Sequence, residues 1–289
     1  MRSITPFTKL HFGTSGSPST TLGKGRSAGV AESIRLGLTT QELAFVRGVN
    51  TTTEDLARIN TLVKQHQFPL TAHGPYYINL NANEPEKVTA SINRILATAR
   101  ALNEAGGFSA TFHAAYYLGQ SPNKVYDTVK KRLLTITKTL REEGNPVRIS
   151  PETTGKPTQF GHYKELLRLA QDVEGLGICI DFAHLHAREN GAYNDQESFR
   201  TVINDTETAL GREALDNMHI HLSGIAYTEK GEQHHLPLQE SDFRWQELLA
   251  IWKEYRLKGA VICESPLRER DALLLQKTYH HQTTRGTTP

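Results

Sequence analysis

The amino-acid sequence predicts a single α/β domain with the (β/α)8 TIM-barrel architecture, and three observations support this prediction. Eight short apolar runs recur along the chain, their centres lie about 36 residues apart, and segments with helical periodicity separate them. That spacing is the length of one strand followed by one crossover helix. Eight such units in a row favour a closed barrel over an open doubly wound sheet, which is the alternative architecture.

The predicted strands lie within the eight apolar runs, which are rich in β-branched residues. In chain order the runs span residues 4–13, 41–48, 68–74, 108–114, 146–152, 176–184, 218–224 and 259–265. Connecting segments with apolar residues at intervals of three and four predict helices over 52–66, 84–106 and 121–144. Residues 1–279 are expected to form the barrel, and the polar, Thr-rich residues 280–289 a flexible C-terminal tail.

The composition is typical of a globular protein. Of the 289 residues, 37% are apolar and 22% are charged, which suffices for one large core. Because no apolar run is long enough for a membrane span or a signal peptide, we expect a cytoplasmic protein without a membrane partner. Cys179 and Cys263 fall inside predicted strands, where reduced, inert thiols are expected.

The charge balance excludes an overall basic field of the kind that alone would imply nucleic acid. The chain has 33 basic and 31 acidic residues, which gives a formal net charge of +2. DNA stays open as a partner, because metal ions bound to a carboxylate cluster would offset part of the negative charge. The 13 histidines invite a search for metal ligands.

Residues able to ligate a divalent metal end six of the eight predicted strands. They are His73, His113, Glu152, Asp181 with His184, His221 and Glu264. Because His, Asp and Glu together make up only about 15% of the chain, chance does not explain six of eight. The carboxyl ends of barrel strands meet at one face, where clustered carboxylates repel one another unless cations lie between them. One such residue would be an ordinary loop residue, but six together predict a metal site.

The types of candidate ligand indicate which metal ions the site would bind. Imidazoles mixed with carboxylates suit Zn²⁺ or Mn²⁺, and the absence of thiolates argues against a Cys-rich structural zinc site. Glu232 and His234, in a predicted loop over 231–236, bring the candidate ligands to nine. Nine are too many for one ion, so two or three ions with a bridging carboxylate are expected. Three further histidines are expected to pack inside the barrel or to contact ligands or substrate: His186, His219 and His235.

Seven motifs carry these residues in order: TAHGPYYINL, TFHAAY, PETTGKPTQFG, CIDFAHLHA, HLSG, GEQHHL and CESP. Over about residues 10–275 the chain resembles the endonuclease IV family of abasic-site DNA repair enzymes, which are three-zinc (β/α)8 barrels. The resemblance implies one zinc held by His73, His113 and Glu152. It implies a second zinc, bridged by Glu152, on Asp181, His221 and Glu264. A third would be held by His184, Glu232 and His234.

The chain departs from the family pattern at three places. The family commonly has Asp-x-His where this chain has Glu232-Gln233-His234, and Asn-Asp where it has Ser223-Gly224. The segment that follows Glu152 also differs from the family's Asn-Thr-Ala-Gly pattern. The longer Glu232 side chain can still coordinate if the backbone retreats by about one bond length.

The resemblance implies a hydrolase, a deoxyribonuclease IV-type apurinic/apyrimidinic endonuclease that acts in base excision repair. Such an enzyme cleaves the phosphodiester 5′ to abasic sites in double-stranded DNA, leaves a 3′-hydroxyl and also clears 3′-blocked ends. Three Zn²⁺ ions per monomer are expected, with Mn²⁺ as an option at one site. Glu152 would be catalytic by orienting the attacking hydroxide, and Tyr76 and Arg47 would bind DNA. Four cations are expected to contact phosphates: Lys156, Arg188, Lys230 and Arg268.

Two alternatives use the same residues differently. A sugar isomerase or epimerase of the xylose-isomerase-like barrels would bind one divalent ion with Glu152, Asp181, His221 and Glu264. Such an enzyme does not need the other candidate ligands. A DNA-binding or scaffolding protein that has lost activity would have no reason to keep nine clustered ligands without metal, because burying such groups is costly.

Overall fold

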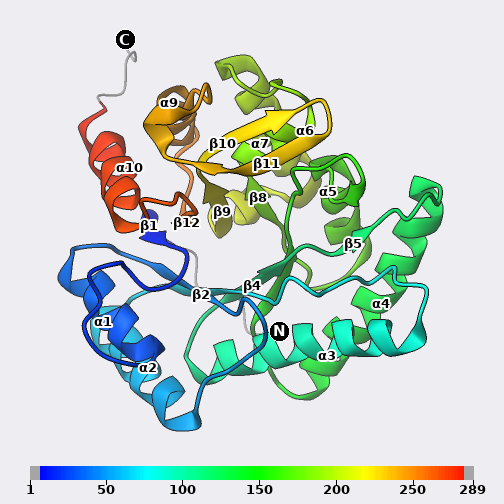
Figure 1. Ribbon diagram of the computed structural model, residues 1–289, viewed down its shortest axis with the longest axis horizontal. Coiled ribbons are helices and arrows are strands. Elements are labelled where there is room, and N and C mark those ends of the chain that lie inside the picture. The colour runs from blue at the N-terminus through cyan, green and yellow to red at the C-terminus, as the bar shows by residue number, and fades with distance from the viewer. Residues whose placement is uncertain (1–6, 283–289) are drawn as a thin grey trace.

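A computed structural model describes residues 7–282, and Figure 1 shows strands at the centre with helices packed around them. The eight barrel strands are β1 (Leu10–Thr14), β2 (Gln41–Ala44), β3 (Leu70–His73), β4 (Ser109–Phe112), β6 (Arg148–Pro151), β8 (Cys179–Asp181), β9 (Met218–Leu222) and β12 (Gly259–Cys263). Each strand lies within or overlaps one of the eight predicted runs. The predicted α/β barrel is therefore confirmed.

The barrel consists of two four-stranded parallel sheets. One has the strand order β1-β12-β9-β8, and the other has the order β2-β3-β4-β6. Isolated bridges join the two sheets at both seams, from Ser15 to Glu42 and from Glu152 to Cys179. Because all eight strands run parallel, their carboxyl ends emerge at one face. Asp181 and His221, for example, are paired in register at the ends of β8 and β9.

The helices are α1 (Arg26–Arg35), α2 (Thr53–His66), α3 (Pro85–Glu104), α4 (Pro122–Glu142), α5 (Tyr163–Asp172), α6 (Phe182–Arg188), α7 (Gln196–Leu210), α8 (Arg212–Leu215), α9 (Trp245–Glu254) and α10 (Glu269–His281). The three helices expected from periodicity are α2, α3 and α4. The side chain of Thr52 caps α2 by accepting a hydrogen bond from Asp55 N, and proline begins both α3 and α4. Within the described part of the chain, no helix is long and apolar enough to cross a membrane.

The C-terminal boundary differs slightly from the expected one. Helix α10 continues through His281, so its last turn includes the first two residues of the segment expected to be a tail. The rest of that segment, 283–289, lies outside the described residues. Cys179 and Cys263 are both buried and unpaired, as their positions in strands predicted.

Two antiparallel strand pairs extend from the loops at the carboxyl ends of the strands, and the second is a hairpin. One pairs β5 (Ala115–Tyr116) with β7 (Gln159–Phe160), and the other pairs β10 (Gly224–Thr228) with β11 (Gly231–Leu236). The segment 231–236, expected to be a loop, is therefore a strand. Figure 1 shows the β10–β11 hairpin, in yellow, packed beside α6. This hairpin brings Glu232 to the same end of the barrel as the strand-end residues.

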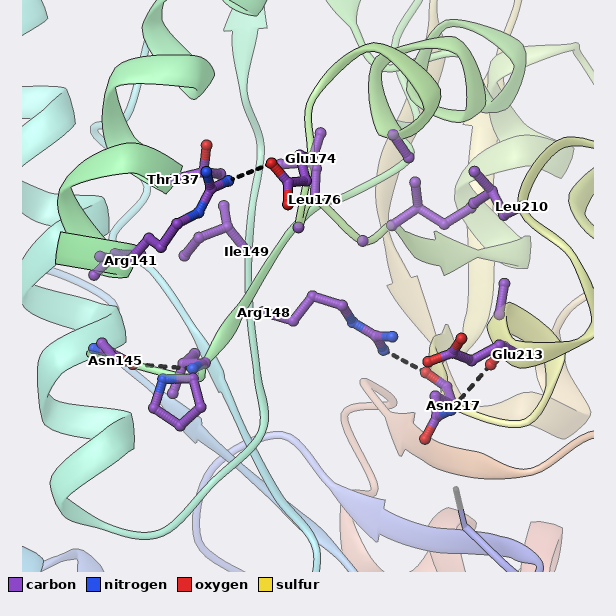
Figure 2. Close-up of a pocket in the computed structure, with 18 of the residues that line it drawn as sticks. Thr137, Arg141, Asn145, Arg148, Ile149, Glu174, Leu176, Leu210, Glu213 and Asn217 are labelled. Atoms are coloured by element: carbon purple, nitrogen blue, oxygen red, sulfur yellow. Dashed lines mark hydrogen bonds and ion pairs between the residues drawn. The ribbon is translucent and has the colours of Figure 1, made fainter. Parts of the chain in front are cut away.

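A cavity of about 950 Å³ opens at the opposite end of the barrel (Figure 2). Arg148, at the start of β6, crosses it and donates a hydrogen bond to the carbonyl of Asn217. Arg141 and Glu174 at its edge form an ion pair of 3.1 Å. None of the predicted site residues lines this cavity. In (β/α)8 barrels the functional groups gather at the other face, at the carboxyl ends of the strands.

Candidate metal centre

The structure gathers eight of the nine predicted ligands at the carboxyl ends of the strands. His73, His113 and Glu152 form one group whose ligand atoms all lie within 4.8 Å of one another, and Glu152, Asp181, His221 and Glu264 form a second such group. A third group contains Asp181 and His184 together with His235, and Glu232 lies beside it. The first two groups have the membership that the resemblance implied.

Glu152 lies at the centre of the cluster and is fully buried. Its Oε2 atom faces the first group, 3.0 Å from His73 Nε2 and 3.5 Å from His113 Nε2. Its Oε1 atom faces the other way, 3.2 Å from His221 Nδ1 and 3.2 Å from His184 Nδ1. One carboxylate thus has an oxygen directed at each of two groups, which is the geometry that a bridging ligand requires.

The two carboxylate oxygens of Asp181 have different surroundings. Oδ1 accepts a hydrogen bond of 2.7 Å from the backbone N–H of His184 and so caps helix α6. Oδ2 is buried without a hydrogen-bond partner among the described residues, and the nearest ring nitrogen is His184 Nδ1 at 3.5 Å. Burial, together with the charges of Glu152 and Glu264, raises the pKa of Asp181. A cation at this oxygen would satisfy it.

The ring nitrogens of His73 have assigned roles. Its Nδ1–H donates to the carbonyl of Gly74 at 2.7 Å, which leaves Nε2 directed at Glu152. Burial alone would lower the pKa of His73, but the hydrogen bond and charge of Glu152, with the charges of Glu42 and Glu264, raise it to about 9. In the metal-free protein a proton therefore occupies the ring nitrogen that a metal ion would take.

Two imidazoles of the third group face each other. His184 Nδ1–H donates to the carbonyl of Thr153 at 3.0 Å, and His235 Nδ1–H donates to the carbonyl of Glu264 at 3.1 Å. Their Nε2 atoms lie 3.2 Å apart, and the Glu232 carboxylate lies 3.6 Å from the first and 3.9 Å from the second. Two lone pairs and a carboxylate converge on one point, which suits a cation.

His234 is not part of this arrangement, and His235 lies beside His184 where the resemblance implied His234. The register of the hairpin shifts between Ala226 and Tyr227, so that Ala226 pairs with His234 but Tyr227 pairs with Glu232. Gln233 is the extra residue of this β-bulge, and the bulge turns residues 232 and 235 toward the same face of the hairpin. His234 is exposed to solvent. In a regular strand 232 and 234 would share a face, which is what the motif spacing implied.

Gly155 allows the hairpin to approach the cluster. Its carbonyl accepts a hydrogen bond of 2.8 Å from Glu232 N. A Cβ atom at Gly155 would lie 2.6 Å from the Cβ atom of Glu232 and 3.1 Å from the ring of His184, which is too close. The departure from the family pattern after Glu152 therefore accompanies a close backbone approach.

Sequence reasoning missed Glu42, a buried carboxylate in the middle of β2. Its Oε2 lies 3.0 Å from His219 Nε2 and 3.1 Å from His221 Nε2. Burial alone would raise its pKa, but His221 and His219 lower it below its usual range. Cys179, His219 and His221 lie close enough to share an ion. The Nε2 atoms of His219 and His221, however, donate to Glu42, so these two nitrogens have no lone pair for such an ion. The sequence signal that could have identified Glu42 is its position as a charged residue inside the apolar run 41–48.

The predicted DNA-binding residues lie on the rim of this face. Tyr76 is 67% exposed, and its ring centroid lies 6.2 Å from that of His73. Its backbone N–H donates to the carbonyl of Val46, so the exposed Arg47 emerges from the adjacent loop. Arg188 is different from the expectation, because it is buried and donates to the carbonyls of Lys156 and Gln159. The other three cations expected to contact phosphates are exposed: Lys156, Lys230 and Arg268.

The fold and the cluster define a (β/α)8 barrel with clustered histidines and carboxylates that could hold metal ions at the carboxyl ends of its strands. A family model described as "Xylose isomerase-like TIM barrel" matches residues 30–281, and the chain belongs to this family.

Two relatives and two solved structures are similar to this chain. An uncharacterized protein of Methanocaldococcus jannaschii, MJ0133, is 42% identical over 94% of this chain and 97% of its own length. A "Probable endonuclease 4" of Mycoplasma pneumoniae is 26% identical over 72% of each chain. Among solved structures, endonuclease IV from Thermus thermophilus superposes with a TM-score of 0.71 at 21% identity, covering 92% of this chain and 97% of that one. A D-tagatose 3-epimerase-like protein gives 0.70 at 16% identity with the same coverage.

Proposed function

We propose that this protein is a metal-dependent hydrolase that cuts double-stranded DNA on the 5′ side of abasic sites and leaves a 3′-hydroxyl. One observation carries the proposal. Glu152 directs one oxygen at His73 and His113 and the other at a second, four-residue group, so the site is larger than a single ion needs. The similarity to "Probable endonuclease 4" of Mycoplasma pneumoniae supports the same reaction class.

The residues present fit metal ions. The unpartnered Oδ2 of Asp181 and the facing Nε2 atoms of His184 and His235 are the clearest signs, because each needs a cation or a proton. We propose Zn²⁺ at three positions, with Mn²⁺ as an option at one. Three groups would hold them: His73, His113 and Glu152; Glu152, Asp181, His221 and Glu264; and His184, Glu232 and His235. When bound, the ions would supply Lewis-acid chemistry to a water and a phosphate.

The protein's own groups would position the DNA. Glu152, at the centre of the cluster, would orient the attacking water. Tyr76 and Arg47 would enter the duplex beside the abasic nucleotide, which costs less to extrude than a normal one because it has no base to unstack. The exposed Lys156, Lys230 and Arg268 would contact phosphates. We further propose that the protein acts as a monomer in the cytoplasm, in base excision repair, and also clears 3′-blocked ends.

The test is an incision assay on a duplex with one abasic-site analogue that resists β-elimination. We expect Zn²⁺-loaded protein to cut on the 5′ side of the analogue, to leave a 3′-hydroxyl and to lose activity with a chelator. An identical duplex with a normal nucleotide is the control and stays intact. A metal-loaded protein that leaves the lesion uncut would refute the proposed reaction.

A second candidate is a sugar epimerase or isomerase with one divalent ion on Glu152, Asp181, His221 and Glu264. The superposition on the D-tagatose 3-epimerase-like protein and the compact four-residue group favour it. Ketohexoses and aldoses incubated with the Mn²⁺-loaded protein test it. Epimerised sugar, together with one bound ion per chain and no DNA cleavage, would support this candidate over the nuclease.

Metal binding is expected to release protons at pH 7. The pKa of His73 is raised to about 9 in the metal-free protein, so its Nε2 carries a proton that an ion must displace. Apparent Zn²⁺ affinity should therefore rise with pH up to about 9 and then level. Calorimetric titrations in buffers of different ionisation enthalpy measure the release, and the His73→Ala variant should release fewer protons. A heat of binding independent of buffer would contradict this prediction.

A further inference from the structure

A buried hydrogen-bond network lies directly beneath the metal centre, inside the barrel. Glu42, on β2, is at its middle and accepts four hydrogen bonds. Its Oε2 accepts from His219 Nε2 at 3.0 Å, from His221 Nε2 at 3.1 Å and from Thr71 Oγ1 at 3.1 Å, and its Oε1 accepts from Ser15 Oγ at 3.3 Å. Glu42, Thr71, His219 and His221 are all fully buried. No water is therefore needed to satisfy this carboxylate.

The network fixes which ring nitrogen carries each proton. An ionised carboxylate only accepts hydrogen bonds, so both histidines must present Nε2–H to Glu42. For His219, this leaves Nδ1 to accept from Ser109 Oγ at 3.0 Å, and Ser109 lies 2.9 Å from Ser150 Oγ. For His221, it leaves Nδ1 directed at Glu152 and Glu264, at 3.2 and 3.5 Å. His221 therefore reaches the metal centre through Nδ1.

We propose that Glu42 is a positioning residue of the metal centre, which holds His221 as its Nε2–H tautomer so that the Nδ1 lone pair meets the ion. Metal-bound histidines commonly donate their second ring N–H to a carboxylate, which fixes ring orientation and strengthens the ligand. The inference rests on the metal-binding part of the proposed function and is independent of DNA cleavage.

The Glu42→Leu substitution tests this role. Leucine has a similar size and offers no acceptor, so neither histidine Nε2–H keeps its partner. His221 then favours the Nδ1–H tautomer, in which Nδ1–H donates to Glu152 or Glu264, and this tautomer leaves no lone pair at Nδ1 for the ion. We expect Zn²⁺ affinity of the four-residue group to fall about 10- to 100-fold, with binding at the other groups retained. Competition with a chelator of known affinity measures it.

Thr71→Val is the matched control. It removes one buried donor to the same carboxylate at nearly constant volume and changes no ring tautomer. Both variants should lose some thermal stability, but Thr71→Val should bind Zn²⁺ like the wild type. Equal loss of affinity in the two variants would show a merely structural role for Glu42.

A measurement on the unmodified protein does not depend on how the variants fold. In the Zn²⁺-loaded wild type, nitrogen-15 NMR of the histidine rings should show His221 protonated at Nε2 and metal-bound at Nδ1. The opposite assignment would overturn the inference. A wild-type protein that binds no Zn²⁺ would instead refute the proposed metal centre itself, so the two failures are distinguishable. Wild-type affinity in Glu42→Leu would refute only the role of Glu42.

Discussion

Replacing Glu152 by Gln is expected to lower the rate of abasic-site incision at least about a thousandfold, the largest effect of any single substitution in the chain. This carboxylate has one oxygen directed at each of two ligand groups. An amide of the same shape retains one acceptor oxygen and presents –NH₂ where the other oxygen was. Two metal positions would therefore lose a ligand at once. Incision rate and bound metal per chain are the measurements.

Glu174→Gln is the control for this substitution. Glu174 is an exposed carboxylate at the opposite end of the barrel, where it pairs with Arg141. The variant undergoes the same chemical change without touching the cluster, so incision and metal content should match the wild type. A Glu152→Gln protein that is folded and still cuts at the wild-type rate would rule out a hydrolytic role for this cluster.

His235→Ala is expected to lower incision about a hundredfold and to release one metal ion, whereas His234→Ala should leave both unchanged. The two residues are neighbours of the same type, so each is the control for the other. Only His235 directs Nε2 at His184, because the bulge in the hairpin turns its side chain toward the cluster. Metal analysis of the purified variants and the incision assay measure the difference.

The reverse result would locate the error in the hairpin. If His234→Ala lost the ion and His235→Ala kept it, β11 would pair with β10 in a regular register, with residues 232 and 234 on one face. If both variants kept all ions and full activity, neither histidine would be a ligand.

The arrangement of the strand ends could be predicted from the sequence because the barrel forces it. Once eight apolar runs are recognised as parallel strands, residues at their carboxyl ends must converge, as His73, Glu152 and Asp181 do. The hairpin was not predictable in this way. Its bulge at Gln233 depends on packing against the barrel, and a shift of one residue exchanges His234 for His235.

The contacts of residues inside the barrel also could not be predicted from the local sequence pattern. Glu42 lies in the middle of an apolar run, and only the closed ring shows that it faces His219 and His221. The role of Arg188 was mistaken for a related reason. A cation at the end of a short helix resembles a surface residue, but the loop after β6 folds over it and supplies carbonyl acceptors.

The cluster lies across a seam between the two four-stranded sheets, so metal binding would affect how the sheets are held together. His73, His113 and Glu152 follow strands of one sheet, whereas Asp181, His221 and Glu264 belong to the other. Glu152 itself forms the bridge to Cys179 that joins the sheets there. Ions held by ligands from both sheets would link the two sheets, so that the seam could not open without release of the metal. Neither half of the chain alone could hold the shared ions.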